Sequence, residues 1–285
     1  ATGDGDLAAR AGAPFALGRP GDGACQPMSQ IFVIDNCDPP ELYYGMKDDP
    51  NPDPLSRNRY RGAIALARER GEIALNPNDL LCACDRLFKE TRLASVNFTR
   101  IQRHSAIDAE ALSRAFVQGR RQVDEAVAFM RAYVKGSADA TLAFTYPHIG
   151  IRESRRILGD YTLTGDDVRN GARFDDAIAR GFYLMDIHNP TETGKPSDLI
   201  VLDQPYDIPY RCLLPRGVEG LLTAGRCISG DHRAMSSYRI TSHCMAVGVA
   251  AGAAAALAAD RRVPPRQLTP DDLRAALRRA NTRLT

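Results

Sequence analysis

Residues 220–259 decide the fold, and they read GLLTAGRCISGDHRAMSSYRITSHCMAVGVAAGAAAALAA. The apolar run Leu221–Gly225 ends in glycine and is typical of a short strand. After a polar loop, the small residues from Thr241 to Ala259 predict a helix. An anion or cofactor site at a helix N-terminus needs this order, because free backbone N–H groups point outward there. A plain strand–loop–helix crossover uses similar residues, so both interpretations stay open.

The segment Thr241–Ala259 is also long enough and sufficiently uncharged for a membrane-spanning helix. Gly248 and Gly252 even form the G-x-x-x-G spacing of membrane helix pairs. However, Ala and Gly dominate the segment in place of Leu, Ile or Phe, and His243 lies near its start. We therefore expect this helix to pack closely on a sheet inside a soluble α/β domain, and we expect no membrane partner.

Composition sets broad limits on function. The chain has 285 residues and a net charge of +2, enough for one large or two modest domains. Because no basic stripe with interleaved aromatic residues occurs, we expect no nucleic-acid partner. The seven cysteines are odd in number and irregularly spaced, which indicates a reduced, cytoplasmic setting. Cys82 and Cys84 lack a second ligand pair, so we predict a buried helix there and no metal site.

Elsewhere the hydrophobic spacing alternates between helix and strand. A helix is predicted from Ile107 to Val134, and strands are predicted at Ser29–Ile34 and Thr141–Tyr146. Thr164 and Thr269 are followed by acidic residues within the first turn, which is typical of helix N-termini. These signals together indicate an α/β chain.

The segment 220–259 resembles the C-terminal flavin-binding motif of the FAD-dependent oxidoreductase family, within the glutathione-reductase and fumarate-reductase-like flavoproteins. Its three pieces are a strand ending in AGR-x-IS, a loop with S-x-R and a C-M-A-x-G-x-A-A-G helix. Other blocks resemble the family in the same order, so the likeness spans essentially the whole chain: ATGDGDLAARAG (1–12), GACQPMSQIFVI (23–34), VNFTRIQ (96–102), RRQVDEAVAFMR (120–131) and HIGIRESRRILGDYTLTGDDV (148–168).

The resemblance implies the fold and the cofactor. It implies an α/β chain that forms part of a Rossmann-like FAD-binding domain with an inserted α+β substrate domain. Residues 1–24 and 205–259 would form the FAD-binding portion, residues 25–204 the substrate domain, and residues 260–285 a C-terminal helix. The cofactor implied is FAD.

One feature of the family is missing from this sequence. The family begins with a βαβ unit carrying G-x-G-x-x-G, whose helix N-terminus holds the pyrophosphate. The sequence contains no G-x-G-x-x-G. We therefore expect a partner chain or segment that carries this unit. A separate subunit, a longer or cleaved polypeptide, and the loss of flavin binding are the alternatives.

Contacts with the cofactor are implied at two glycine-rich turns and in the loop before the small-residue helix. An ordinary Asp-Gly turn is the alternative for the first turn, and a structural salt bridge is the alternative for Arg239. The implied cofactor-binding residues are Gly3, Asp4, Gly5, Asp6, Gly225, Arg226, Ser229, Ser236 and Arg239.

Two residues are candidates for catalysis. His188 ends an apolar run, and a His at a strand end facing a flavin is a natural proton donor or acceptor. A His that only hydrogen-bonds a loop is the alternative. Arg152 belongs to a cluster with Glu153, Arg155 and Arg156, where we expect most members to form bracing Arg–Glu pairs. We predict that Arg152 holds a substrate carboxylate or carbonyl.

The sequence thus predicts an FAD-dependent oxidoreductase that transfers a hydride between a small organic substrate and flavin. It would work as one chain or fragment with the dinucleotide-binding segment supplied from elsewhere. The alternative is a non-catalytic structural subunit that keeps the fold without binding flavin alone.

Overall fold

The computed structural model describes residues 1–39, 42, 61–74, 82–84, 91–191 and 197–279. The chain divides into two compact units, which are described separately. Unit 1 comprises Ala1–Gln26, Glu153–Asn189 and Ser197–Thr285, and unit 2 comprises Pro27–Arg152 and Pro190–Pro196.

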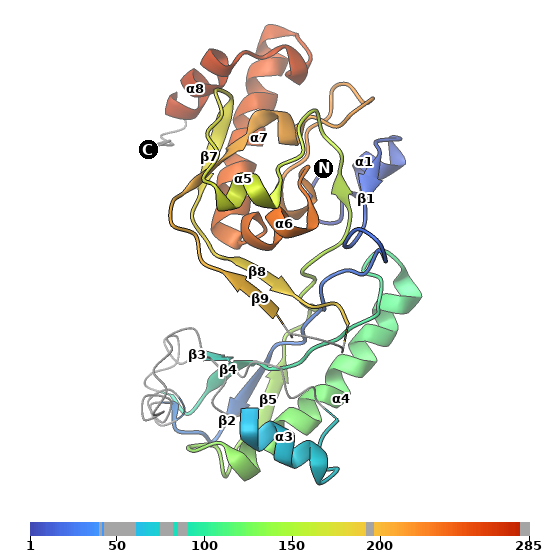
Figure 1. Ribbon diagram of the computed structural model, residues 1–285, viewed down its shortest axis with the longest axis vertical. Coiled ribbons are helices and arrows are strands. Elements are labelled where there is room, and N and C mark those ends of the chain that lie inside the picture. Colours follow the sequence, from blue (N-terminus) through green and yellow to red (C-terminus); the bar gives the residue numbers. More distant parts are fainter. Residues whose placement is uncertain (40–41, 43–60, 75–81, 85–90, 192–196, 280–285) are drawn as a thin grey trace. The chain divides into compact units, whose positions relative to one another are not determined.

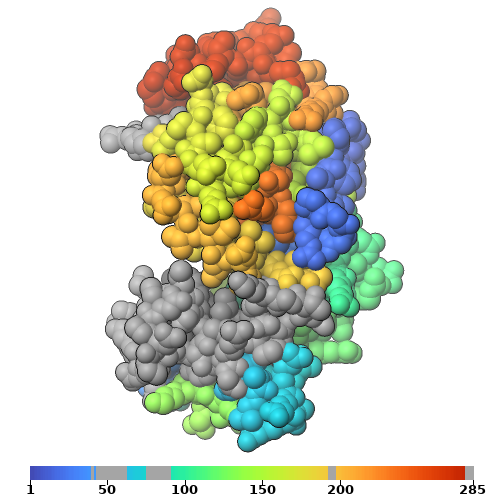
Figure 2. Space-filling view, in the orientation of Figure 1, coloured from blue at the N-terminus to red at the C-terminus, as the bar shows by residue number. Residues whose placement is uncertain are grey.

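Unit 1 mixes helices with short antiparallel strand pairs (Figure 1). The strand β1 pairs with β6, β7 with β10, and β8 with β9. Figure 2 shows the N-terminal residues (blue) beside those near residue 160 (yellow-green), as the β1–β6 pairing requires. The elements are α1 (Asp6–Arg10), β1 (Phe15–Ala16), β6 (Arg156–Ile157), α5 (Gly165–Arg169), β7 (Ala177–Gly181), β8 (Met185–His188), β9 (Ser197–Ile200), β10 (Tyr206–Pro209), η1 (Tyr210–Leu213), η2 (Gly225–Cys227), α6 (His232–Tyr238), α7 (Thr241–Arg261), η3 (Pro265–Gln267) and α8 (Pro270–Arg279).

The core of unit 1 forms around one side of α7. Val247, Ala250 and Ala254 of this helix are buried in a cluster that also contains Leu273 and Leu277 of α8. The helix contacts β7 and α8, and small side chains allow such close packing. Among the described residues, α7 is also the helix whose length and composition would suffice to cross a membrane.

Unit 2 is an antiparallel sheet with helices against it. The sheet has the strand order β3-β4-β2-β5, and Phe32 lies opposite Val96 in the β2–β4 register. The helix α4 buries Val123 and Phe129 in the same cluster as these two residues. The elements are β2 (Phe32–Asp35), α3 (Arg61–Glu69), β3 (Cys82–Cys84), β4 (Ala94–Asn97), α4 (Ala109–Tyr133) and β5 (Thr141–Thr145).

Several local predictions are confirmed. The helix predicted at Ile107–Val134 is α4, which begins after an Asp108 cap, and the two predicted strands are β2 and β5. Thr164 forms a reciprocal capping box with Asp167 at α5. Thr269 and Asp272 likewise exchange hydrogen bonds at the start of α8.

Two local predictions are wrong. Cys82–Cys84 is the strand β3 and not a helix, because it pairs with the distant strand β4, and tertiary pairing overrides a short local pattern. Leu221–Ala224 forms no regular strand. Its backbone bonds to Leu213 and Ala1 are isolated and too few for a ladder.

The compact units have different boundaries from the predicted domains. Residues Glu153–Asn189 belong to the same compact unit as the two ends of the chain, although the sequence places them in the substrate domain. The reason is tertiary, since β6 pairs with β1, and β7 pairs with β10. The functional division into a flavin domain and a substrate domain stays a prediction.

Candidate functional site

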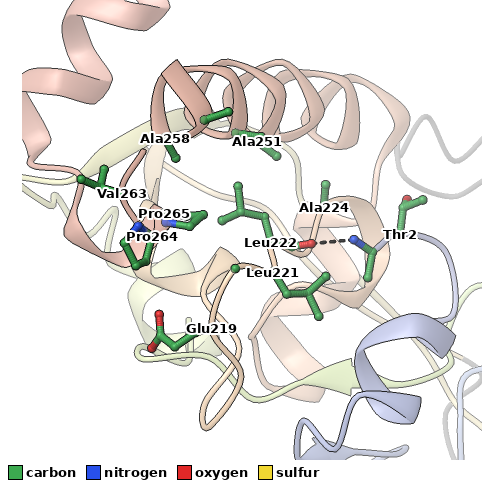
Figure 3. Close-up of a pocket in the computed structure, with 14 residues that line it drawn as sticks. Thr2, Glu219, Leu221, Leu222, Ala224, Ala251, Ala258, Val263, Pro264 and Pro265 are labelled. Carbon is green, nitrogen blue, oxygen red and sulfur yellow. Dashed lines mark hydrogen bonds between the residues drawn. The ribbon is translucent and has the colours of Figure 1, made fainter. Parts of the chain in front are cut away.

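In unit 1, the segment that begins at Ala1 lies beside the segment Leu221–Ala224, and each segment leads into a glycine turn. The backbone N of Ala1 donates to the Leu222 carbonyl at 2.6 Å, a bond drawn in Figure 3. The Ala224 N–H donates in turn to the Ala1 carbonyl at 2.8 Å. These two bonds have the alternation of a single parallel bridge, without forming regular strands. Ligands of α/β proteins bind beyond the carboxyl ends of parallel strands. The turns beginning at Gly3 and Gly225 lie at that end.

Charged side chains join the two turns. Arg226 donates from Nη2 to the Asp4 carboxylate at 3.0 Å and from Nη1 to Ser154 Oγ at 3.1 Å. Arg155 donates to the Asp4 carbonyl at 3.2 Å and pairs with Asp6 at 2.5 Å. The structure therefore brings together predicted site residues more than 200 positions apart in the sequence.

Both turns hold a glycine with positive φ, and the backbone is open at Gly3, whereas a Cβ at Gly225 would lie 3.3 Å from Thr2 Oγ1. Gly3 has φ +63° and Gly225 has φ +82°, in the left-handed region that favours glycine. A Cβ at Gly3 would meet no atom within 4 Å, whereas one at Gly5 would meet Ile157 at 2.9 Å. Gly5 therefore serves packing, while Gly3 presents bare backbone.

The first glycine turn carries a related pattern. Gly3, Gly5 and Ala8 fit the looser form G-x-G-x-x-A of the dinucleotide-binding turn. However, the helix α1 that follows has five residues, which is shorter than the crossover helix of a βαβ unit. We therefore assign no pyrophosphate site to α1.

Ser229 and Ser236, two other predicted contacts, have internal partners. The Ser229 hydroxyl lies 3.0 Å from Thr162 Oγ1, and the Ser236 hydroxyl donates to the Arg233 carbonyl at 2.6 Å. Both side chains are fully buried. Their side-chain hydroxyls thus stabilise the loop and α6.

Arg239 and His188 meet at a third residue, Asp186. The His188 Nε2 lies 3.0 Å from the Asp186 carboxylate. Arg239 donates from Nη2 to the Asp186 carbonyl at 3.3 Å and lies 3.7 Å from its carboxylate. Burial lowers the pKa of Arg239, whereas the Asp186 charge raises it. The Arg239 Nε is buried and has no protein partner, so this cation keeps an unused donor.

A buried network holds the backbone of His188. The His188 N–H donates to the Gln26 side chain at 3.2 Å, and the Gln26 N–H donates to the Glu153 carboxylate at 2.8 Å. Glu153 also pairs with Arg156 and with His232 Nδ1. The predicted Arg–Glu pairing is thus present at Glu153 and Arg156.

Arg152, the second catalytic candidate, belongs to unit 2. Its Nη1 donates to the Pro27 carbonyl and to Ser29 Oγ, both at 2.7 Å. These contacts fix the guanidinium against the start of the segment that leads to β2. The substrate role of Arg152 stays a prediction.

The N-terminus of α7 follows Arg239 directly. Ile240 is its N-cap and provides no side-chain acceptor, so the first-turn N–H groups have no side-chain cap. Thr241 and Ser242 are exposed. A helix start of this kind favours negative charge.

A broad apolar pocket of about 760 Å³ lies beside the paired segments. Leu222 points toward Ala251 of α7, and Leu221 points the other way (Figure 3). Val263, Pro264 and Pro265 close one end of the pocket. Glu219 is its single ionisable side chain. This pocket therefore favours apolar contact, and its carboxylate pairs with Arg266 at 2.7 Å.

A family model described as FAD dependent oxidoreductase matches residues 1–277. The chain belongs to the FAD-dependent oxidoreductase family. Its cofactor is FAD, and its general activity is that of a flavin oxidoreductase. No curated protein matched the chain, and no solved structure matched it.

The described residues of this family member fit FAD. Gly3 offers open backbone, Arg239 keeps a buried donor, and α7 begins without a side-chain cap. Among the described residues, no cluster of three or more His, Cys, Asp or Glu could hold a metal.

Sequence reasoning missed Asp186 and Ser154. The D-x-H spacing of Asp186 and His188 could have revealed the first, because alternate residues of a strand share a face.

Proposed function

We propose that this chain is one part of an FAD-dependent oxidoreductase that transfers a hydride between a small organic substrate and flavin. In this proposal, unit 1 is the larger part of a Rossmann-like FAD-binding domain, and unit 2 provides substrate contacts. The bridge between Asp4 and Arg226 carries the proposal, because it joins two turns at the carboxyl ends of parallel segments.

Each group has a distinct role in this proposal. Gly3 and Gly225 let the cofactor approach the backbone, and Arg226 keeps the two turns together. The first turn of α7 and the Arg239 guanidinium stabilise negative charge on the flavin ring. When bound, FAD supplies the hydride chemistry, while the protein supplies orientation and electrostatics. His188 takes or gives the accompanying proton, and Arg152 holds a substrate carboxylate or carbonyl.

We further propose that a segment carrying G-x-G-x-x-G docks on unit 1. Support comes from the open face of α7, which we define as Met245, Gly248, Val249, Gly252, Ala255, Ala256 and Ala259. All seven positions are exposed and apolar. Small side chains let a sheet pack closely, and exposed apolar patches mark interaction sites. On this proposal, α7 packs against protein on both sides and not against lipid.

The test is the visible absorption spectrum of the purified chain, together with the mass of every chain present. We expect bound oxidised flavin in material that contains the G-x-G-x-x-G segment. Substrates would then reduce that flavin under anaerobic conditions. A preparation that contains this segment and stays colourless with added FAD would contradict the enzyme and favour a structural subunit.

A matched pair of variants locates the cofactor. Arg226→Gln breaks the bridge between the turns, and we expect it to weaken FAD binding by about tenfold or more, as removal of a charge-assisted hydrogen bond does. Arg233→Gln removes a surface pair with Asp166 on α5 and should leave FAD affinity unchanged. Equal affinities for the two variants would place the cofactor elsewhere.

A further inference from the structure

One edge of the strand β8 binds the side chains of two residues that are far apart in the sequence. The His188 N–H donates to Gln26 Oε1 at 3.2 Å, and the Asp186 carbonyl accepts from Arg239 Nη2 at 3.3 Å. In an antiparallel pair, every second residue turns its N–H and C=O groups away from the partner strand. Asp186 and His188 are two positions apart in β8, so both bonds leave the strand on the edge opposite β9. Gln26 and Arg239 are therefore neighbours along this edge.

The side-chain amide of Gln26 is held in one orientation. The residue is 2 % exposed, and its own backbone N–H donates to the Glu153 carboxylate at 2.8 Å. Because the His188 N–H is a donor, the amide oxygen of Gln26 must face it, and the Nε2 group must face elsewhere. This Nε2 group is buried and has no hydrogen-bond partner. Gln26 therefore presents a buried donor that has no acceptor in the protein.

Arg239 presents a second donor of the same kind. Its side chain is 11 % exposed and contacts the carbonyl and the carboxylate of Asp186. Its Nε group is nevertheless buried without a partner. A buried N–H group without an acceptor destabilises the folded state, and native proteins keep few such groups. Two of them beside each other on one strand edge indicate a bound group that supplies the acceptors.

A short segment connects this edge with the glycine turns of the candidate site. Glu153 accepts the hydrogen bond from the Gln26 backbone, and the next residue, Ser154, accepts one from Arg226 at 3.1 Å. Arg226 in turn pairs with Asp4. The Gln26 amide is thus linked through hydrogen bonds to the two turns that would contact FAD.

We propose that Gln26 Nε2 and Arg239 Nε donate hydrogen bonds to the carbonyl oxygens of the flavin ring, so that Gln26 is a cofactor-binding residue. The inference rests on the proposed function, which places the flavin ring beside Arg239. The Gln26 amide carries no charge, and Asp186 already shares the Arg239 cation. A buried phosphate would need an unshared cation, whereas a neutral ring carbonyl needs only donors.

Binding of FAD to the complex that contains the G-x-G-x-x-G segment tests this contact, with flavin fluorescence as the measure of affinity. Gln26→Glu keeps an oxygen for the His188 N–H and replaces the Nε2 donor by an acceptor. We expect it to weaken FAD binding by about tenfold or more. Gln204→Glu is the matched control, because the exposed Gln204 amide donates to the Asn170 carbonyl. The control should leave FAD affinity unchanged.

The infrared spectrum of the bound flavin separates a contact from a general structural role. A carbonyl group that loses a hydrogen bond stretches at higher frequency, so Gln26→Met should raise the frequency of a flavin carbonyl band. Gln26→Met buries no charge, and it replaces Gln26→Glu if the latter does not fold. Gln204→Met should leave the bands in place. Unchanged carbonyl bands in a folded Gln26 variant would overturn the proposal and make a buried water molecule the partner of Nε2.

The contact and the proposed enzyme fail in different ways. Bound flavin whose bands depend on Gln26, but which no substrate reduces, would contradict hydride transfer and leave the contact standing. Bound flavin that substrates reduce, with bands independent of Gln26, would support the enzyme and contradict the contact. An unmodified complex that binds no FAD would contradict both.

Discussion

The two long helices α4 and α7 differ on the side that faces solvent. The exposed positions of α4 carry charged residues such as Glu110, Arg114 and Asp124. The open face of α7 carries only apolar residues. Both helices bury their other side in a core. The difference teaches that a helix with one polar side can expose that side to solvent, whereas a helix that is apolar all round is stable only when other protein or lipid buries both of its sides.

The buried sides differ as well. In α4 the buried side chains include Phe129, which contacts the rings of Phe98 and Tyr133. In α7 they are mostly alanines, such as Ala250 and Ala254. The helix α4 therefore stabilises its unit through the apolar area that its large side chains bury. The small side chains of α7 instead allow the backbone of neighbouring elements to approach closely.

The largest expected effect is on the buried side of α4. Phe129→Ala should lower the free energy of unfolding by about 3–5 kcal/mol, because it removes a buried ring and leaves a cavity. Chemical denaturation followed by circular dichroism measures the loss. Ala128→Ser, on the exposed side of the same helix, is the control and should change stability by less than about 0.5 kcal/mol. Equal losses would show that α4 does not pack as described.

The buried side of α7 should respond to added volume. Ala254 is fully buried, so Ala254→Leu should destabilise the chain by about 1–3 kcal/mol through overpacking. The matched substitution Ala256→Leu lies on the open face and should cost nothing measurable in the chain alone. Thermal unfolding of the two variants compares them directly. A stable Ala254→Leu variant would mean that this side of α7 has free space.

The first turn of α7 should make stability depend on pH. Burial lowers the pKa of His243, and its neutral ring donates from Nδ1 to Ser237 and accepts at Nε2 from Phe182. The folded state thus binds fewer protons than the unfolded state. The stabilisation is present above the unfolded pKa of about 6.5 and is lost as pH falls through the folded pKa.

Denaturant midpoints measured between about pH 8 and pH 5 test this dependence. His243→Gln keeps a donor and an acceptor but does not titrate, so its stability should fall less on acidification. Parallel curves for the variant and the unmodified chain would contradict the role of His243.

Substitutions of the exposed valines of α7 and α4 should have the smallest effect on stability, and they test the difference between the two helices most directly. Val249 of α7 is 45 % exposed and Val117 of α4 is 54 % exposed. Val249→Lys and Val117→Lys should each change the free energy of unfolding by less than about 0.5 kcal/mol. Only Val249→Lys should weaken binding of the G-x-G-x-x-G segment, measured by co-purification. Equal binding by both variants would mean that the open face of α7 is not the docking surface.

The sequence predicted what depends on local pattern. The amphipathic spacing gave α4 almost to the residue, and the threonine–aspartate pairs gave the starts of α5 and α8. These predictions succeed because spacing and caps act within one or two turns of a helix. The family motifs also identified FAD as the cofactor.

The sequence could not predict what depends on distant partners. Cys82–Cys84 became a strand because β4 lies beside it, and Glu153–Asn189 joined unit 1 through pairing with β1 and β10. The role of Asp186 as the shared partner of His188 and Arg239 also required the fold, because α6 and β8 are separated by a long stretch of chain.

The sequence by itself therefore determined the family, the cofactor and the helices with strong periodicity or caps, since these depend on neighbouring residues. The tertiary structure alone decided that Asp4 meets Arg226 and that one side of α7 stays open. It also decided that a carboxylate faces His188. The physical reason is that long-range contacts arise when separate segments bury apolar surface together, and no local pattern encodes which segments will meet.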